Sequence, residues 1–328
     1  MAFGGFPFVG SGATSMGSLT VANMQQLPLN IHSTDSYWPL INDVFSNPTW
    51  KRMYYAHAKT IADEYFSSGV YQSMANTYQT LIDTAVQSDV NKMFTYSQFQ
   101  SSLNTDITVG SYMVPGINNL ITSRMSYLQG TAEFQAAAPV ISGIVSTPAQ
   151  PIIYDTVWVN CNMTNGTSIW LGSRDYLFGK FAKQPMFDDG LHHDGGAGDG
   201  IFGAGIFCSS TQMDYYIYAE NANAGIFSPA RAEHEFYHLN VTNNIVYYKE
   251  VAFNEIMAKN DAAIMDQNGE YDDWIELYNT SNHRINLSDL YLSDNKNDKL
   301  KWRFPINASI DSHSELIVWT DGDSTQQG

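Results

Sequence analysis

The chain has 328 residues, of which 44% are hydrophobic and 13% aromatic, so it can bury the cores of two or three domains and is not a disordered chain. Its 33 Asp and Glu against 16 Lys and Arg give a formal net charge of −17, which excludes nucleic acid and anionic membrane surfaces as expected partners. Cations, neutral glycans and other surface proteins are the partners that we expect instead.

The sequence contains neither a predicted membrane-spanning segment nor a predicted export signal. No apolar run approaches the roughly 18 residues that a membrane-spanning helix needs, and nothing near Met1 resembles a signal peptide. Few Lys with many Asn, Ser, Thr, Tyr and Gly are typical of exported bacterial proteins. We therefore expect an extracellular or cell-surface location, with the export signal upstream of Met1.

The first 36 residues are rich in Gly, Ser and Thr and open on an apolar stretch, Met1 to Phe8. We interpret them as a loop that packs its aromatic side chains against something larger. A helix is predicted next, because Pro48 follows Ser46 and Asn47 and apolar residues recur at helical spacing until Gly69. The predicted apolar stripe comprises Trp50, Met53, Tyr54, His57, Ile61 and Tyr65, with His57 as a packing histidine.

Three more helices are predicted, near residues 70–86, 96–103 and 116–128. The first of them carries its apolar residues on one stripe, made of Met74, Tyr78, Leu81, Ile82 and Ala85. Together the helices form a predicted helical subdomain.

This helical part resembles the C-terminal end of the CotH family of spore-coat and secreted kinase-like proteins. The resemblance covers about residues 1–135 and rests on four motifs: Tyr37 to Ile41, Asn47 to Tyr54, Ala85 to Asp89, and Ile121 to Leu128. In that family a Trp-Asp pair assigned to metal and nucleotide binding precedes a stretch like Ala2 to Phe6. The resemblance therefore implies a domain truncated at its N-terminus, whose ATP and Mg²⁺ ligands lie upstream of Met1, and no catalytic or cofactor-binding residue in this chain.

Residues 136–152 are predicted to be a linker into a first immunoglobulin-like β-sandwich at 153–240. Cys161 and Cys208 fall on inward-facing positions of predicted strands, where a disulfide and two buried thiols both stay open. The six predicted strands are residues 156–163, 168–172, 180–187, 200–208, 213–219 and 233–238.

Residues 188–200 are the candidate site of this sandwich. Asp188, Asp189, Asp194 and Asp199 are separated by glycines, the composition with which a loop can hold a structural Ca²⁺. The same residues also form ordinary turns, in which Asp side chains bond backbone amides, and both interpretations stay open. The neighbouring His192 and His193 point to opposite sides of an extended segment, so they are expected to lie in a solvated loop.

After a linker at 241–250, residues 251–328 alternate short apolar runs with turn residues, which predicts a second small β-sandwich. Its motifs resemble the lamin-tail domain of secreted bacterial proteins: Asn254 to Met257, Asp272 to Asn279, Leu287 to Asp294, and Lys301 to Pro305. That family implies an immunoglobulin-like fold without catalytic residues, and a domain that is truncated here at its C-terminal edge. Trp274 and Trp302 are expected in its core, and the acidic turn around Asp266 is expected to be solvated.

The sequence thus predicts a multidomain α + β chain, with an N-terminal helical subdomain followed by two immunoglobulin-like β-sandwiches. No nucleophile elbow, phosphate loop or zinc helix motif is present. The expected function is a non-catalytic segment of an exported, modular bacterial surface or matrix protein, with spacer or adhesion modules. The alternatives are the C-terminal remainder of a secreted CotH-like kinase and a set of glycan-binding modules.

Overall fold

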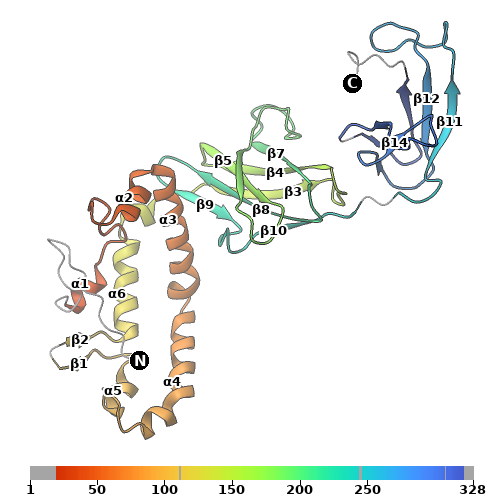
Figure 1. The fold of residues 1–328 in the computed structure, drawn as a ribbon. Coiled ribbons are helices and arrows are strands. Elements are labelled where there is room, and N and C mark those ends of the chain that lie inside the picture. Colours follow the sequence, from red (N-terminus) through yellow and green to blue (C-terminus); the bar gives the residue numbers. More distant parts are fainter. Residues whose placement is uncertain (1–19, 111, 244–245, 307, 321–328) are drawn as a thin grey trace. The chain divides into compact units, whose positions relative to one another are not determined.

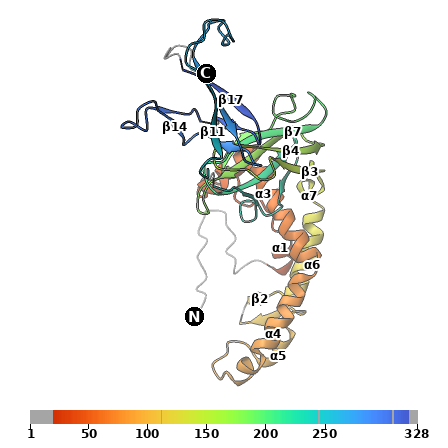
Figure 2. The same ribbon diagram turned by 90° about the vertical axis from the view of Figure 1, so that its right-hand side faces the viewer.

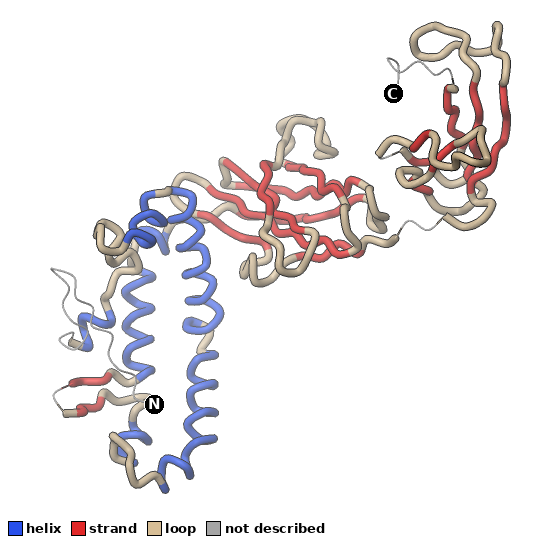
Figure 3. Tube along the Cα trace, viewed as in Figure 1, coloured by secondary structure: helices blue, strands red, loops and turns tan. Residues whose placement is uncertain are grey.

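The computed structural model describes residues 20–110, 112–243, 246–306 and 308–320. The chain separates into two compact units, and Figures 1 and 3 show their helices and strands. The first unit comprises residues up to 142 together with 162–171 and 216–236, and the second comprises 143–161, 172–215 and the residues from 237 onward. The N-terminal stretch 1–19, which contains the predicted apolar opening, lies outside the described residues.

The helices all belong to the first unit. They are α1 (Val21–Gln25), α2 (Pro39–Ser46), α3 (Pro48–Ile61), the π-helical segment η2 (Ala62–Ser67), α4 (Val70–Ser88), α5 (Tyr96–Ser101), α6 (Ile117–Gln129) and α7 (Ala132–Gln135). A two-stranded hairpin, β1 (Ile107–Val109) with β2 (Tyr112–Val114), lies at the α5 end of the helices (Figures 1 and 2). Within the described ranges, no helix combines the length and the apolar character that a bilayer crossing requires.

Local sequence explains where α3 begins and where the helical run ends. The side chain of Asn47 accepts hydrogen bonds from the amides of Thr49 (3.0 Å) and Trp50 (3.1 Å), and Pro48 occupies the first helical turn, where its missing amide is not needed. The run ends before Gly69, whose φ of +77° suits a residue without a side chain. The four predicted helices are confirmed, as α3 continued by η2, α4, α5 and α6.

The apolar stripe predicted on α3 is not its buried face. Trp50 and Ile61, which belong to the predicted stripe, are 52% and 50% exposed, whereas Tyr55 and Ala56 are buried. Ala62, which directly follows α3, packs in a small core with Met125 and Leu128 of α6. Small alanines allow the neighbouring segments to approach closely, so the buried face lies elsewhere than hydrophobicity alone indicates. His57 does pack as predicted, stacking on Phe227 at 4.4 Å between ring centroids.

The middle of the chain forms two antiparallel sheets. One has the strand order β10-β8-β5-β6 with β9 also paired to β8, and the other has the order β3-β4-β7. The strands are β3 (Val140–Thr147), β4 (Thr156–Thr164), β5 (Ser168–Arg174), β6 (Ala182–Pro185), β7 (Ile201–Phe207), β8 (Gln212–Glu220), β9 (Gly225–Ser228) and β10 (Tyr237–Asn240). These sheets are consistent with the predicted β-sandwich.

Two details of that prediction need correction. The predicted linker at 136–152 contains β3, which pairs with β4, and β9 was not among the predicted strands. Strand β9 pairs with residues 217–220 of β8, beyond the residues 212–215 that pair with β10, so it bonds backbone groups of β8 that β10 does not reach. Within the first unit, β9 pairs with the end of β8 and also contacts α3.

Cys161 and Cys208 are both buried, as predicted, and both are free thiols. Burial raises the pKa of Cys161 to about 12 and that of Cys208 to about 11. The interpretation as two buried thiols therefore describes this structure, and neither group is a reactive thiolate at neutral pH.

The C-terminal strands form a three-stranded sheet, β11-β12-β17, and two strand pairs, β13-β16 and β14-β15. Their bounds are β11 (Val251–Met257), β12 (Trp274–Asn279), β13 (Ile285–Asn286), β14 (Tyr291–Leu292), β15 (Trp302–Arg303), β16 (Ser309–Ile310) and β17 (Glu315–Trp319). Their core consists of Leu277, Ile285, Leu287, Phe304 and Ile310. Trp274 is buried, as predicted, and Trp302 packs against this core.

Asn279 at the end of β12 is fully buried and holds two loops together. Its Nδ2 donates to the carbonyls of His283 (2.7 Å), Ile310 (3.0 Å) and Asp311 (3.0 Å). Its Oδ1 accepts from the backbone amide (2.9 Å) and the hydroxyl (2.7 Å) of Ser281. An amide with both ends satisfied in the core fixes the registers of β13 and β16 more strictly than an apolar residue can.

We predict that Asn279→Ala destabilises the C-terminal sheet by about 2–4 kcal/mol, because it removes a buried donor from three carbonyls and leaves a cavity. Urea unfolding followed by fluorescence measures this free energy. Asn297→Ala, at an exposed position, is the matched control and should change it by less than about 0.5 kcal/mol. Equal effects of the two substitutions would contradict this role of Asn279.

Candidate functional site

The Asp-rich loop predicted as a cation site connects β6 to β7. It is closed at its base by the pairing of Phe187 with Gly203, whose amides and carbonyls exchange hydrogen bonds of 2.9 and 2.8 Å. The carbonyl of His192 passes so close to Gly203 that a Cβ added there would lie 2.2 Å from it. Only glycine fits at that crossing, so the sequence fixes the path of the loop.

Backbone amides surround the carboxylates of this loop. Asp188 accepts from the amides of Gly198 (2.7 Å), Asp199 (3.1 Å) and Gly200 (3.0 Å). Asp199 in turn accepts from Gly196 (2.8 Å) and Ile201 (2.9 Å). Each of these two acids therefore holds its own stretch of the loop, in the manner that the turn interpretation describes.

Asp194 is the most deeply placed acid of the loop and has no solvent exposure. Its Oδ2 accepts from the amides of Asp189 (2.7 Å) and Gly190 (2.9 Å), and its Oδ1 accepts from the amide of His192 (2.8 Å). Burial by itself would raise the pKa of Asp194, but the amide donors outweigh it and the pKa is lowered. Asp194 is therefore an ionised group that the loop folds around.

Asp189, His192 and Asp194 form the one cluster among the described residues in which three potential metal ligands converge, with ligand atoms within 4.8 Å of one another. His192 Nδ1 lies 2.8 Å from Asp189 Oδ1, and this contact, followed by the amide of Leu191, lowers the pKa of Asp189. Two of the four predicted aspartates therefore converge. Asp188 and Asp199 lie outside this cluster, and the histidine was not among the predicted ligands.

Both histidines of the loop pack against aromatic rings. His192 stacks on Phe187 with 4.6 Å between centroids and meets the edge of Trp158 at 6.0 Å, and His193 stacks on Trp158 at 4.6 Å. The segment is bent rather than extended, with His193 at a φ of +56°, and only His192 joins the two carboxylates. A nitrogen ligand beside two carboxylates suits a transition metal better than Ca²⁺, which prefers oxygen.

A second charged cluster, which sequence reasoning missed, lies on β8. The carboxylate of Asp214 is buried and accepts from Arg174 Nε at 2.9 Å, while His238 Nδ1 lies 2.7 Å from its other oxygen. Arg174 also stacks over the ring of Phe181. The available signal was a single Asp inside an otherwise apolar strand, which requires a partner when it is buried.

The third cluster joins α3 to β8 inside the first unit. Arg52 makes a bidentate contact with Glu220, from Nη2 to Oε1 at 2.7 Å and from Nε to Oε2 at 2.9 Å. The hydroxyls of Thr49 (3.1 Å) and Tyr218 (2.9 Å) donate to the same carboxylate. Burial disfavours the charge of Glu220, but these four donors outweigh it and lower its pKa.

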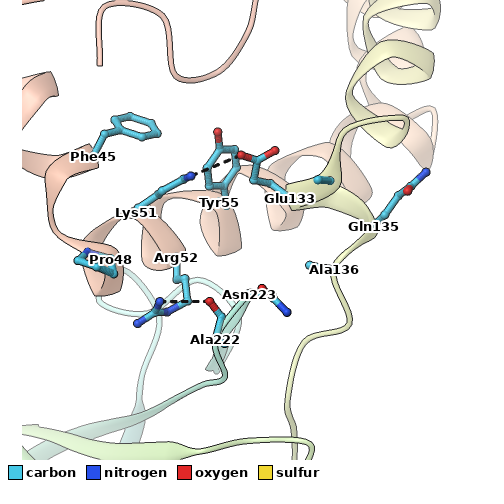
Figure 4. A pocket seen from close by; sticks show the side chains of 11 residues that line it. Phe45, Pro48, Lys51, Arg52, Tyr55, Glu133, Gln135, Ala136, Ala222 and Asn223 are labelled. Atoms are coloured by element: carbon cyan, nitrogen blue, oxygen red, sulfur yellow. Dashed lines mark hydrogen bonds and ion pairs between the residues drawn. The ribbon is translucent and has the colours of Figure 1, made fainter. Parts of the chain in front are cut away.

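Beside this pair lies a cavity of about 670 Å³, shown in Figure 4. Lys51 and Glu133 face each other across it with 3.5 Å between Nζ and Oε1, and Lys51 lies over the ring of Tyr55. Arg52 closes one side by donating to the carbonyl of Ala222 at 3.4 Å. The remaining lining residues are Phe45, Pro48, Ala132, Gln135, Ala136 and Asn223.

Comparison with protein families finds a match in the C-terminal part of the chain. The Lamin Tail Domain matches residues 247–328. The Lamin Tail Domain assignment covers β11 to β17 and confirms that part of the predicted resemblance. No curated protein matches the chain. The predicted CotH-like part and the separate immunoglobulin-like domain stay predictions.

We expect the melting temperature to be the same with millimolar Ca²⁺ and with excess chelator, because amide donors already hold the four aspartates of the loop. A cation present at a hundred times its Kd would add about 2.7 kcal/mol to the free energy of unfolding. A rise in melting temperature that the chelator reverses would therefore establish the cation site and contradict the turn interpretation.

For the pair on α3 and β8, we predict that Glu220→Gln costs about 3–5 kcal/mol, because it leaves Arg52 facing an uncharged amide at a position where its own side chain is 17% exposed. Glu64→Gln is the matched control. It breaks the more exposed pair with Arg231, whose side chains are 38% and 35% exposed, and should cost less than about 1 kcal/mol.

The same pair gives a pH dependence with a defined sign. The folded state lowers the pKa of Glu220. The stabilising free energy of the ionised carboxylate is therefore complete above the ordinary glutamate pKa, and it is lost as the pH falls through the lowered value. Urea unfolding at a series of acidic pH values should show a smaller loss of stability in Glu220→Gln than in the wild type. A parallel loss in both proteins would contradict the assignment.

Proposed function

We propose that this chain is a non-catalytic segment of an exported, modular bacterial surface or matrix protein, in which β-sandwich modules act as spacers or adhesive modules. The Lamin Tail Domain match at residues 247–328 carries this proposal, because it identifies a β-sandwich module next to two further antiparallel sheets. In this proposal residues 1–135 are a CotH-like helical part, 153–240 an immunoglobulin-like sandwich and 251–328 the lamin-tail sandwich.

The use of the buried charges supports a structural role. Arg52 with Glu220 and Arg174 with Asp214 each join two segments that are distant in sequence. A group whose hydrogen-bonding capacity is filled by such partners is a poor proton donor or acceptor for substrate, whereas it resists the separation of the segments that it joins. This is the chemistry expected of a spacer.

Within the second unit, residues on either side of the predicted linker at 241–250 are also in contact. Arg284 forms an ion pair with the buried carboxylate of Asp155, and Asn286 Nδ2 donates to the carbonyl of Ile153 at 3.3 Å. Ile152 also pairs with Thr242. These contacts support a spacer in which the lamin-tail strands are anchored to the segment at 152–155.

The cavity in Figure 4 favours glycan binding as a second candidate. It offers the half-buried aromatic ring of Phe45, the amides of Gln135 and Asn223, and the carboxylate of Glu133, which are the groups that stack on sugar rings and bond their hydroxyls. Trp274 lies in the core, as expected, and is not available for stacking. The kinase-like alternative rests on resemblance alone, with ATP and Mg²⁺ bound only by a longer parent protein.

We predict that antibodies against residues 247–328 label intact cells of the source organism, and that protease added outside the cells removes the labelling. A periplasmic or cytosolic marker protein must survive the same treatment for the result to count. Recovery of the chain only from the cytosolic fraction, protected from protease until the cells are broken, would overturn the proposed location and with it the spacer role at the surface.

A further inference from the structure

The chain contains two Asn-Gly pairs, Asn165-Gly166 and Asn268-Gly269. Glycine has no Cβ, so the backbone nitrogen that follows the asparagine is unhindered and can approach the asparagine side chain. An asparagine in such a pair reacts with its own backbone when this nitrogen attacks the carbon of the side-chain amide. The rate depends on how freely the pair can move, and the structure holds the two pairs differently.

The pair Asn165-Gly166 is tied to segments that are distant in sequence. The Nδ2 of Asn165 donates to the carbonyls of Ala137 (3.3 Å) and Ala138 (3.1 Å). The carbonyl of Asn165 accepts from the Nδ2 of Asn221 at 2.9 Å. The side chain of Asn165 must lose its two bonds before its amide can turn toward the following nitrogen, and each bond lost adds to the barrier.

The pair Asn268-Gly269 lies in the connection between β11 and β12 and is bonded within its own turn. The Nδ2 of Asn268 donates to Oδ2 of Asp266 at 2.8 Å, and the amide of Gly269 donates to the carbonyl of Asp266 at 3.2 Å. Both residues of the pair are exposed. An exposed turn opens locally at a low free energy, because such an opening disrupts few buried contacts.

The space beside the two glycines also differs. A Cβ added at Gly166 would lie 2.3 Å from Sδ of Met163. At Gly269, no described residue other than its chain neighbours comes within 4 Å of the corresponding position. The backbone at Gly269 therefore has room to rotate toward the side chain of Asn268, whereas the backbone at Gly166 is crowded.

We propose that Asn268 is a site of spontaneous modification, at which the nitrogen of Gly269 attacks Cγ of Asn268. A bond forms between these two atoms, the bond from Cγ to Nδ2 breaks, and ammonia leaves with the proton of the attacking nitrogen. Water then hydrolyses either C–N bond of the cyclic imide, which gives aspartate or isoaspartate. The reaction consumes water alone and involves no oxidation or reduction.

The modification changes the turn between β11 and β12. Either product replaces a neutral amide with a carboxylate, so Oδ2 of Asp266 loses a donor and faces a like charge. Isoaspartate also lengthens the backbone by one methylene group, which displaces the amide of Glu270 from its 2.8 Å hydrogen bond to Oδ1 of Asp266. The modified chain therefore carries one more negative charge and a looser acidic turn.

Peptide mapping by mass spectrometry tests the proposal on the full chain. The protein is incubated for several weeks at mildly alkaline pH, where the attacking nitrogen loses its proton more readily. Each asparagine is followed by its mass increase of one dalton and by the separation of the two products. We expect Asn268 to convert about tenfold faster than Asn165, the factor that a barrier lower by about 1.4 kcal/mol produces. In denaturant the two rates should become similar, because the contacts of Asn165 are lost.

Two variants connect the rates to the structure. Gly269→Ala should slow the conversion of Asn268 by about tenfold, because the added methyl group hinders the attack, and should leave Asn165 unchanged. Asn221→Ala removes a donor that holds Asn165 and should accelerate conversion of Asn165 alone.

Four outcomes overturn the proposal. They are an unmodified Asn268 in the folded chain, conversion of Asn165 at an equal or higher rate, a difference between the pairs that persists in denaturant, and an unchanged rate in Gly269→Ala.

Discussion

The contact between Arg52 and Glu220 is the interaction on which the first unit depends. A carboxylate in the interior is costly unless its oxygens are filled, and here a bidentate guanidinium and two hydroxyls fill them. The donors come from α3 and from the strand β8 itself, so the charge is compensated only when the helix lies on that strand. The pair therefore selects one docking of the helices on the sheet, which apolar contacts such as His57 on Phe227 then reinforce.

Other buried carboxylates of this chain, which has a net charge of −17, are also compensated by hydrogen-bond donors. Asp214 lies between an arginine and a histidine, Asp155 meets Arg284, and Asp194 collects three backbone amides. Most acids stay in water, where their mutual repulsion favours solubility. Of the buried acids, Asp155, Asp214 and Glu220 join segments that are distant in sequence, whereas Asp194 holds its own loop in place.

Local sequence pattern was sufficient to predict the elements whose structure is determined by residues close together in the chain. The alternation in β4, β7 and β12 and the Asn47–Pro48 helix start predicted these elements well. The exposure of the apolar stripes on α3 and α4, and the strand β9, could not be predicted from local pattern, because burial and pairing depend on segments that are distant in the sequence. At the candidate loop, composition identified the aspartates but not their grouping with His192. The role of Glu220 could not be predicted from the sequence, because its partner Arg52 lies 168 residues away along the chain.

Native-state hydrogen exchange under increasing denaturant tests the coupling of helix and sheet most directly. If the buried pair joins α3 to β8 and β9, the slowest amides of the three elements should share one opening free energy and one dependence on denaturant. Their isotherms would then merge into a single unfolding event. Opening of α3 at a lower free energy, with β8 and β9 still protected, would show that the helices and the strands are independent and would contradict this account.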